Sequence, residues 1–433
     1  METAQLPIVV IEGAKGTGKT LTARFLIARS TLSGLALSAD VSTPKLDADL
    51  LPILGSIQAS EKYLGEIDNA RRSIAMNMGN GDPQLAGDSR AYIRENLRNN
   101  LSEREWTETW LDVIGWSAGV NPGKQGSGAL LIEQLRKTNR RIVAVIEGIE
   151  ETYESISTHS VATMLRSVLI DLPIKLRSEP GRPLGLLVFA RRDSVGSGVQ
   201  QNLNQFRSQY KEFALTWNEG DVLELAAWIA TKSGALKLWD RNFSSLPQDE
   251  KERLLFKLWG RKLGPDDQPG RERVKEAYTA GWVIAALSDL QGRLVARDLV
   301  RFLQYAAGIP VTSDSYAERL LAPSALKAAI GPTSKRKVAE TEEEIKDLSA
   351  VFKKFREAQN SIKAPIDQGA ITDLQLSAED IDLLKLHGII LGDSPPYEVP
   401  ELFRMGLGLR HAGARHSVLG TRRRARQRLK DTG

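Results

Sequence analysis

The feature that most constrains this chain is a glycine-rich octapeptide close to its first residue. Residues 13–20 are Gly-Ala-Lys-Gly-Thr-Gly-Lys-Thr, which fits the pattern Gly-x-x-x-x-Gly-Lys-Ser/Thr. The β-branched run at residues 8–11 precedes it, and residues 20–28 have the composition of a helix. A strand, a glycine-rich turn and a helix in this order predict a loop whose backbone N–H groups converge on phosphate groups, helped by the positive end of the helix dipole.

The residue types of this loop indicate separate roles. The glycines let the backbone approach the phosphates, Lys19 reaches the β- and γ-phosphates, and the Thr20 hydroxyl holds Mg²⁺. A purely structural glycine-rich turn is the alternative, and the flanking strand and helix disfavour it. We therefore expect ATP or ADP with Mg²⁺ as cofactors. The predicted nucleotide-binding residues are Gly13, Lys15, Gly16, Thr17, Gly18, Lys19, Thr20 and Leu21.

Composition excludes several other classes of site. The chain has 433 residues, enough for about three domains. It has no cysteine, which excludes disulfides, Cys-ligated zinc, iron–sulfur clusters and a cysteine nucleophile, and its four histidines are scattered. No apolar run approaches the roughly 18 residues that span a bilayer, and no secretory signal is recognisable, so we expect a cytoplasmic protein with no membrane partner.

The positive net charge is concentrated at the end of the chain. Residues 410–433 contain eight basic residues and one acid, more than the whole net charge of +5, so residues 1–409 are slightly acidic. The run Arg422–Lys430 could contact nucleic-acid phosphates without sequence specificity. A solvated charged end is the alternative, because the run has no interleaved aromatic residues.

Short apolar runs alternate with helical segments in the first half of the chain. Strands are expected at residues 8–11, 35–41, 141–146, 185–190 and 213–217. Such runs, bounded by turns, predict a buried parallel sheet flanked by helices. Residues 43–130 form an insertion whose role the sequence does not indicate, and its Trp106, Trp110 and Trp116 are expected to be core or interface anchors.

The second half is predicted to be helical and then of winged-helix type. Helices are expected at residues 222–229, 250–258, 271–290, 296–306, 340–359 and 377–387. After the last of these come a tight turn, an apolar pair, a Gly-Asp-Ser-Pro-Pro turn and Tyr397-Glu398-Val399, an order typical of a winged helix. The expected domains are residues 1–218 (nucleotide binding), 219–312 (an all-α lid), 313–409 (winged helix) and 410–433 (basic tail).

Acidic residues follow the strand predicted at 141–146. The segment is Glu147-Gly148-Ile149-Glu150-Glu151. It resembles the strand-Asp-Gly-hydrophobic-Asp-Glu motif of the STAND class of P-loop ATPases, which includes NACHT proteins and lies close to AAA+ ATPases within the ASCE group. The resemblance implies that Glu147 supports the magnesium ion and that Glu150 or Glu151 activates water. Both aspartates of the motif are glutamates here, which shifts each carboxylate by about 1.5 Å and implies slow hydrolysis. An acidic helix N-terminus is the alternative.

Arginines occupy two further positions that the resemblance makes significant. Arg191 or Arg192 ends the strand at 185–190, where STAND proteins carry an arginine that senses the γ-phosphate. Arg297, with Arg301 as second choice, is similar in position to the second sensor of AAA+-like lids. Surface arginines on a solvated helix are the alternative in both cases. His387 is better explained as a favourable partner of a helix C-terminus than as a phosphate ligand.

The combined prediction is an α/β P-loop NTPase followed by an all-α lid and a winged-helix domain. We expect an ATP-binding, slowly hydrolysing switch that changes conformation or oligomerises with nucleotide state. The resemblance implies a prokaryotic multi-protein system, such as antiviral defence, with a homo-oligomer or a separately encoded effector or sensor as partner. The alternatives are a nucleotide-regulated DNA-binding regulator or loader, a scaffold with a degenerate nucleotide site, and a small-molecule kinase, which the long C-terminal half disfavours.

Overall fold

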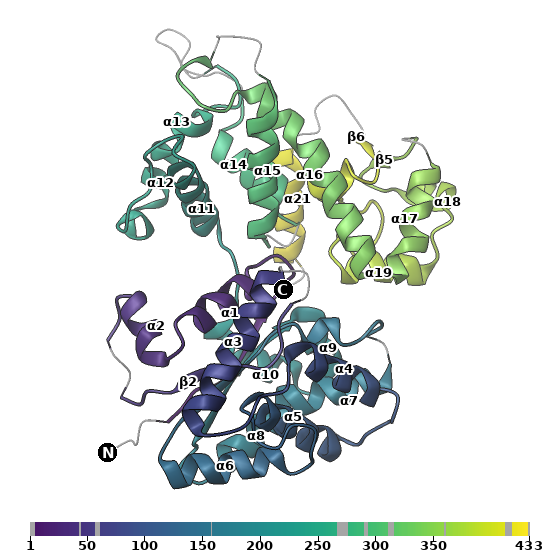
Figure 1. Cartoon of the computed structure of the whole chain (residues 1–433). Helices are drawn as coiled ribbons and strands as arrows, with labels where there is room; N and C mark the ends of the chain where they lie inside the picture. Colours follow the sequence, from purple (N-terminus) through teal and green to yellow (C-terminus); the bar gives the residue numbers. More distant parts are fainter. Residues whose placement is uncertain are drawn as a thin grey trace. The chain divides into compact units, whose positions relative to one another are not determined.

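The chain divides into two compact units, residues Met1–Leu215 and Thr216–Gly433 (Figure 1). The computed structural model describes residues 5–42, 45–56, 61–156, 158–265, 276–289, 293–310, 316–358, 361–411 and 418–431. None of the helices in these ranges is long and apolar enough to cross a membrane. Each unit is described by itself below.

The first unit is built on a four-stranded parallel sheet of order β1-β4-β3-β2. Its strands are β1 (Ile8–Gly13), β2 (Asp49–Pro52), β3 (Ile142–Ile146) and β4 (Leu184–Arg191). Its helices are α1 (Lys19–Ala28), α2 (Leu32–Ser38), α3 (Glu61–Met78), α4 (Ala86–Asn96), α5 (Glu103–Ser117), α6 (Ser127–Thr138), η1 (Ile149–Glu151), α7 (His159–Arg166), η2 (Ser167–Asp171), α8 (Leu172–Ser178), α9 (Arg192–Gly198), α10 (Leu203–Gln209) and η3 (Lys211–Phe213). The predicted α/β class with a helix-flanked parallel sheet is confirmed.

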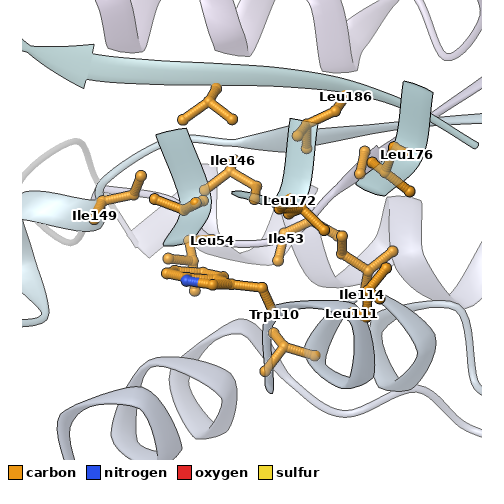
Figure 2. Close-up of a cluster of buried hydrophobic side chains, with 14 of the residues drawn as sticks. Ile53, Leu54, Trp110, Leu111, Ile114, Ile146, Ile149, Leu172, Leu176 and Leu186 are labelled. Atoms are coloured by element: carbon orange, nitrogen blue, oxygen red, sulfur yellow. The ribbon is translucent and has the colours of Figure 1, made fainter. Parts of the chain in front are cut away.

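Both faces of this sheet are buried, which explains its continuous apolar strands. In β3, Val143 and Val145 pack toward α1, whereas Ile142, Ala144 and Ile146 enter the larger core on the other face. That larger core contains Trp106, Trp110 and Trp116 of α5, all of them fully buried as expected for core anchors. Figure 2 shows Trp110 and Leu54 close together, facing strand residues that include Ile146 and Leu186.

Two of the strand predictions are wrong. Residues 35–41, expected as a strand, belong mainly to helix α2, which the Thr31 side chain caps by accepting a hydrogen bond from the Gly34 N–H. Ala36 is buried and Leu32 and Leu35 are partly buried against the core, with helical spacing, and the second strand of the sheet is instead β2. The strand expected at 213–217 is reduced to a single parallel bridge between Leu215 and Gly13, at the free edge of β1.

The second unit is mainly helical. It contains α11 (Glu219–Lys232), η4 (Phe243–Ser245), α12 (Gln248–Leu254), α13 (Phe256–Trp259), α14 (Thr279–Leu287), α15 (Ala296–Gly308), α16 (Pro323–Glu344), α17 (Asp347–Glu357), β5 (Lys363–Ala364), α18 (Gln368–Asp373), α19 (Ala378–Leu386), α20 (Glu401–Arg404), β6 (Arg410–His411) and α21 (Val418–Asp431). Strands β5 and β6 pair in parallel. One hydrophobic cluster lies mainly within residues 222–330 and a second within residues 338–409.

Several predicted helices in this unit change their bounds. The segment 250–258 divides into α12 and α13, and 340–359 divides between α16 and α17. Of the helix predicted at 271–290, the structure has α14. Residues 271–275 and 290 of that prediction lie outside the described ranges. The helix at 377–387 is present as α19, with Ser377 and Asp380 forming a capping box. It is followed by an antiparallel bridge between Leu391 and Glu398 across the proline turn.

Candidate nucleotide-binding and hydrolysis site

The glycine-rich loop connects β1 to α1 and contains two glycines with positive φ angles. Gly16 and Gly18 have φ angles of 82° and 107°, a region that glycine adopts without strain. A side chain at Gly13 would lie 2.6 Å from the Thr17 hydroxyl, whereas no atom lies within 4 Å of a side chain built at Gly18. The loop therefore packs tightly against Gly13, whereas there is free space beside Gly18, the residue before α1.

Lys19 is the first residue of α1, and its side chain reaches back to this loop. Its ammonium group donates hydrogen bonds to the carbonyl oxygens of Gly13 at 2.9 Å and Ala14 at 3.1 Å. Burial lowers the pKa of Lys19, and the nearby carboxylates of Glu150 and Glu147 oppose this effect. A desolvated ammonium beside backbone carbonyls gains from an incoming anion, so Lys19 is suited to hold a phosphate group. Lys15, also in the loop, has electrostatic or hydrogen-bond partners of its own.

Thr20 and Glu147 form the second part of the site. The Thr20 hydroxyl donates a 2.6 Å hydrogen bond to Glu147 Oε1, joining the loop to the end of β3. Glu147 is 4% exposed, and burial raises its pKa despite that hydrogen bond. A hydroxyl and a carboxylate at this distance are oxygen ligands that suit Mg²⁺, which keeps most of its waters and needs few protein ligands. The longer side chain of glutamate thus reaches the Thr20 hydroxyl at the start of α1.

The candidate magnesium site contains two protein ligands, Thr20 and Glu147, and not a larger cluster of acids. Among the described residues, no three His, Asp or Glu side chains gather into a metal-binding group. A magnesium ion held by Thr20, Glu147 and nucleotide phosphates requires no such cluster.

Glu150 and Glu151 face different partners. Glu150 Oε1 accepts a 2.7 Å hydrogen bond from the Arg191 N–H, and the charge of Lys19 acts on it. Burial nevertheless raises the pKa of Glu150. Glu151 Oε1 instead accepts a 2.5 Å hydrogen bond from the Ser56 hydroxyl. Of the two acids, Glu150 is the one that interacts electrostatically with Lys19.

Gly148 allows the acidic residues to follow the strand so closely. Its φ is +86°, and a side chain there would lie 3.0 Å from the Gly55 carbonyl carbon and 3.1 Å from the Ser56 nitrogen. The segment after β2 therefore packs directly on Gly148. The Ser56 N–H donates to Glu147 Oε2 at 3.0 Å, so Ser56 contacts both Glu147 and Glu151.

The two candidate sensor arginines at the end of β4 have different partners. Arg191 forms two hydrogen bonds with Asp193, and its charge acts on both Lys19 and Glu150. Arg192 lies 3.4 Å from Glu12, which Arg207 of α10 also contacts at 3.0 Å. Arg191 is therefore the arginine close to the candidate phosphate position.

The candidate arginines of the second unit form ion pairs there. Arg301 makes a two-point ion pair with Glu340 of α16, and Arg297 lies 3.8 Å from the same carboxylate. Leu21, included in the predicted nucleotide set, is 74% exposed on α1. His387 caps the end of α19, as its helix-terminal position suggested.

Sequence reasoning missed Ser56 because it placed the second strand at residues 35–41. The apolar run Leu50-Leu51-Pro52-Ile53-Leu54 followed by Gly-Ser was the available signal. In a parallel sheet, the residues after each strand gather at one edge, so a strand assigned there would have brought Ser56 to the acids.

Comparisons with known proteins add little to this geometry. No protein-family model matches the chain, and neither does any curated protein. One similar solved structure is that of the Aeropyrum pernix ORC2 protein in ADPNP–ADP complexes, with a TM-score of 0.41 and 12% identity over 99% of this chain and 89% of that one. Similarity at this level assigns neither a family nor an activity, so the function is inferred from the site itself.

Proposed function

We propose that the protein is a magnesium-dependent P-loop ATPase of the STAND/AAA+-like group. The observation that carries the proposal is the 2.6 Å contact between Thr20 and Glu147, formed beside a glycine loop that surrounds the Lys19 ammonium group. A hydroxyl, a carboxylate and a buried ammonium in this arrangement match the charge pattern of a magnesium–nucleotide complex.

Each residue of the site has a defined part in the proposed reaction. The loop amides and Lys19 hold the phosphates, while Thr20 and Glu147 hold the metal ion, which when bound neutralises phosphate charge. Glu150 accepts a proton from the attacking water, because desolvation raises the pKa of its carboxyl group and the charge of Lys19 acts on it. The Arg191 guanidinium, which the Asp193 carboxylate orients, stabilises charge that develops on the γ-phosphate.

Nucleotide binding to wild-type protein and to Lys19→Ala tests the proposal. Lys62→Ala is the matched control, because Lys62 is an exposed lysine on α3 of the same unit. We expect Lys19→Ala to lose ATP·Mg²⁺ binding measured by calorimetry, and Lys62→Ala to bind as the wild type does. Equal ATP affinity in all three proteins would refute the proposal.

For the biological role, we propose a switch whose conformation or assembly follows the bound nucleotide. The two-unit organisation supports this, since nucleotide exchange in one unit can act on a separate helical unit. The resemblance to STAND proteins favours a cytoplasmic component of a multi-protein system, such as antiviral defence. In that system the partner is a second copy or a separately encoded effector or sensor.

A nucleotide-regulated DNA-binding protein is the alternative function, and α21 would carry it. This helix places Arg423 in an exposed position. Two observations weigh against it: Arg422 and Arg424 are engaged in ion pairs with Glu219 and Glu398, and α19 carries three acids in nine residues. DNA affinity that falls steeply with salt and disappears on deletion of residues 420–433 would favour this alternative.

A further inference from the structure

The segment Gly55–Ser56 supports both ends of the acidic stretch after β3. Ser56 donates to Glu147 through its N–H and to Glu151 through its hydroxyl, while Gly55 packs on Gly148. A shift of this segment would therefore move the metal-binding acid and its neighbours together.

Arg90 of α4 contacts that segment and the acid that it bonds. Its guanidinium donates a hydrogen bond to the Gly55 carbonyl oxygen and lies 4.0 Å from Glu151 Oε2. Arg94, one helical turn later, donates to the Glu151 carbonyl oxygen at 2.7 Å. Arg90 and Arg94 of α4 thus contact the side chain and the backbone of Glu151, and Arg90 also contacts the Gly55–Ser56 segment.

Arg90 is costly to bury, which indicates that its position serves more than packing. The residue is 5% exposed, and burial lowers its pKa, an effect that the Glu151 carboxylate opposes. Arg71 of α3 offers a contrast: it is fully buried and bonds the backbone carbonyls of Pro52 and Ile53, which supports the chain path after β2. Arg90 differs from it in facing an acid of the candidate site.

We propose that Arg90 of α4 is a positioning residue for the acids that follow β3. The proposal rests on the proposed ATPase function and assigns a role to one residue of the insertion at residues 43–130. The hydrogen bond and ion pair described for Arg90 are with Gly55 and Glu151, not with the glycine-rich loop. Arg90 acts through Gly55, Ser56 and Glu151, so its loss should lower the turnover rate more than the nucleotide affinity.

Three variants test this proposal in the full-length chain. Arg90→Gln removes the charge, Arg90→Lys keeps it, and Arg98→Gln is the control, since Arg98 is exposed just beyond the end of α4. For Arg90→Gln we expect kcat to fall by about 10- to 100-fold with the ATP·Mg²⁺ dissociation constant changed less than about threefold. Arg90→Lys should recover part of kcat, and Arg98→Gln should match the wild type.

Hydrogen exchange provides a readout that does not depend on turnover. The amides of Glu151 and Thr152 bond the carbonyls of Gly148 and Ile149 at 3.2 and 3.0 Å. Arg90→Gln should raise exchange in residues 147–152 while α5 stays protected. Exchange raised equally through α3, α4 and α5 would assign Arg90 a general structural role and overturn the proposal.

The outcomes separate this proposal from the ATPase proposal. If the wild type binds but does not hydrolyse ATP, hydrolysis is refuted, and the exchange pattern still decides the role of Arg90. If the wild type hydrolyses ATP and Arg90→Gln equals Arg98→Gln in both readouts, the role of Arg90 is refuted. If Arg90→Gln does not fold, Arg90→Lys and Ser56→Ala are compared with the wild type instead. We expect a reduced kcat in both variants. A wild-type kcat and a wild-type exchange pattern in both would contradict the proposal.

Discussion

Two glutamates that follow β3 determine what the candidate site can do at a given pH. Burial raises the pKa values of Glu147 and Glu150, while hydrogen bonds and the charge of Lys19 act against the increase. A raised pKa makes a carboxylate a stronger base and also makes its ionised form less stable in the folded protein. The same residues are therefore expected to affect both turnover and stability.

Substitution of Glu150 by glutamine should remove the proton acceptor without removing a nucleotide contact. We expect kcat to fall by at least about 100-fold, because general-base catalysis contributes about 10²- to 10⁴-fold. The acid limb of the wild-type kcat/KM profile should lie above the pKa of a free glutamate, since Glu150 must be ionised to act. Steady-state kinetics from pH 4 to 9 measures both effects. Loss of activity in Glu151→Gln together with an active Glu150→Gln would reverse the assignment of the two acids.

Substitution of Glu147 by glutamine should stabilise the nucleotide-free protein at neutral pH. The folded pKa is raised, so the folded state binds more protons than the unfolded one between the two pKa values, and stability falls as pH rises through that window. Glutamine carries no charge and can still accept from the Ser56 N–H and donate to the Thr20 hydroxyl oxygen. Thermal unfolding at pH 4 and pH 8 should show the variant gaining stability over the wild type as pH increases. Stability equal to that of the wild type at both values would contradict the raised pKa.

At the scale of elements, the site lies where strand ends and helix starts meet. The loop after β1, the segment after β2, the acids after β3 and Arg191 at the end of β4 all occupy the carboxyl edge of one parallel sheet. Each residue reaches this edge because the strand before it is buried on both faces and is fixed in register by its neighbours.

Gly148 forms the turn between β3 and the acids Glu150 and Glu151. Gly148→Ala should destabilise the protein by about 1–3 kcal/mol, because its φ of +86° and the 3.0 Å approach of Gly55 both exclude a side chain. Gly65→Ala is the matched control: Gly65 lies inside α3 with no atom within 4 Å of an added side chain, so alanine should stabilise by about 0.5–1 kcal/mol. Chemical denaturation of the two variants measures the difference. Equal stability of the two variants would contradict the close packing at Gly148.

At the scale of the whole molecule, two units with separate cores are joined between Leu215 and Thr216. Within the second unit, α21 carries part of the basic run and binds acidic partners from distant parts of that unit. Arg422 pairs with Glu219 at the start of α11, and Arg424 pairs with Glu398 beyond the proline turn. The final helix thereby connects the two clusters of this unit.

Arg424→Gln should destabilise the second unit, because Glu398 is 2% exposed and would lose its countercharge. Arg424 is itself 41% exposed, so solvent screening reduces the expected cost to about 1–2 kcal/mol. Arg423→Gln, which changes an exposed neighbour on the same helix, should cost less than about 0.5 kcal/mol. Thermal unfolding of both variants makes the comparison, and equal midpoints would show that the ion pair contributes nothing.

A nucleotide-dependent change in assembly is the expectation for the complete chain. Size-exclusion chromatography with light scattering should give a larger species with a non-hydrolysable ATP analogue and Mg²⁺ than with ADP and Mg²⁺. The Lys19→Ala variant should give the smaller species in both conditions. An identical mass in all samples would contradict the assembly switch and would leave a change of conformation alone to be tested.

The sequence by itself determined the parts of this protein that depend on local pattern. The strand before the loop, the helix after it and the acids following β3 were all predictable, because buried strands are continuous apolar runs and the loop needs its glycines in fixed places. The capping residues Asn218 and Ser377 likewise indicate where α11 and α19 begin.

The tertiary structure decided what depends on contacts between distant residues. Thr20 and Glu147 are 127 positions apart, and Ser56 and Glu147 are 91 apart, so no local spacing predicts either contact. Residues 35–41 show the same limit, because a short apolar stretch fits a strand or a helix until its packing partner is known. The choice between Glu150 and Glu151, and the role of Arg90, follow from which groups the folded sheet edge brings within hydrogen-bonding distance.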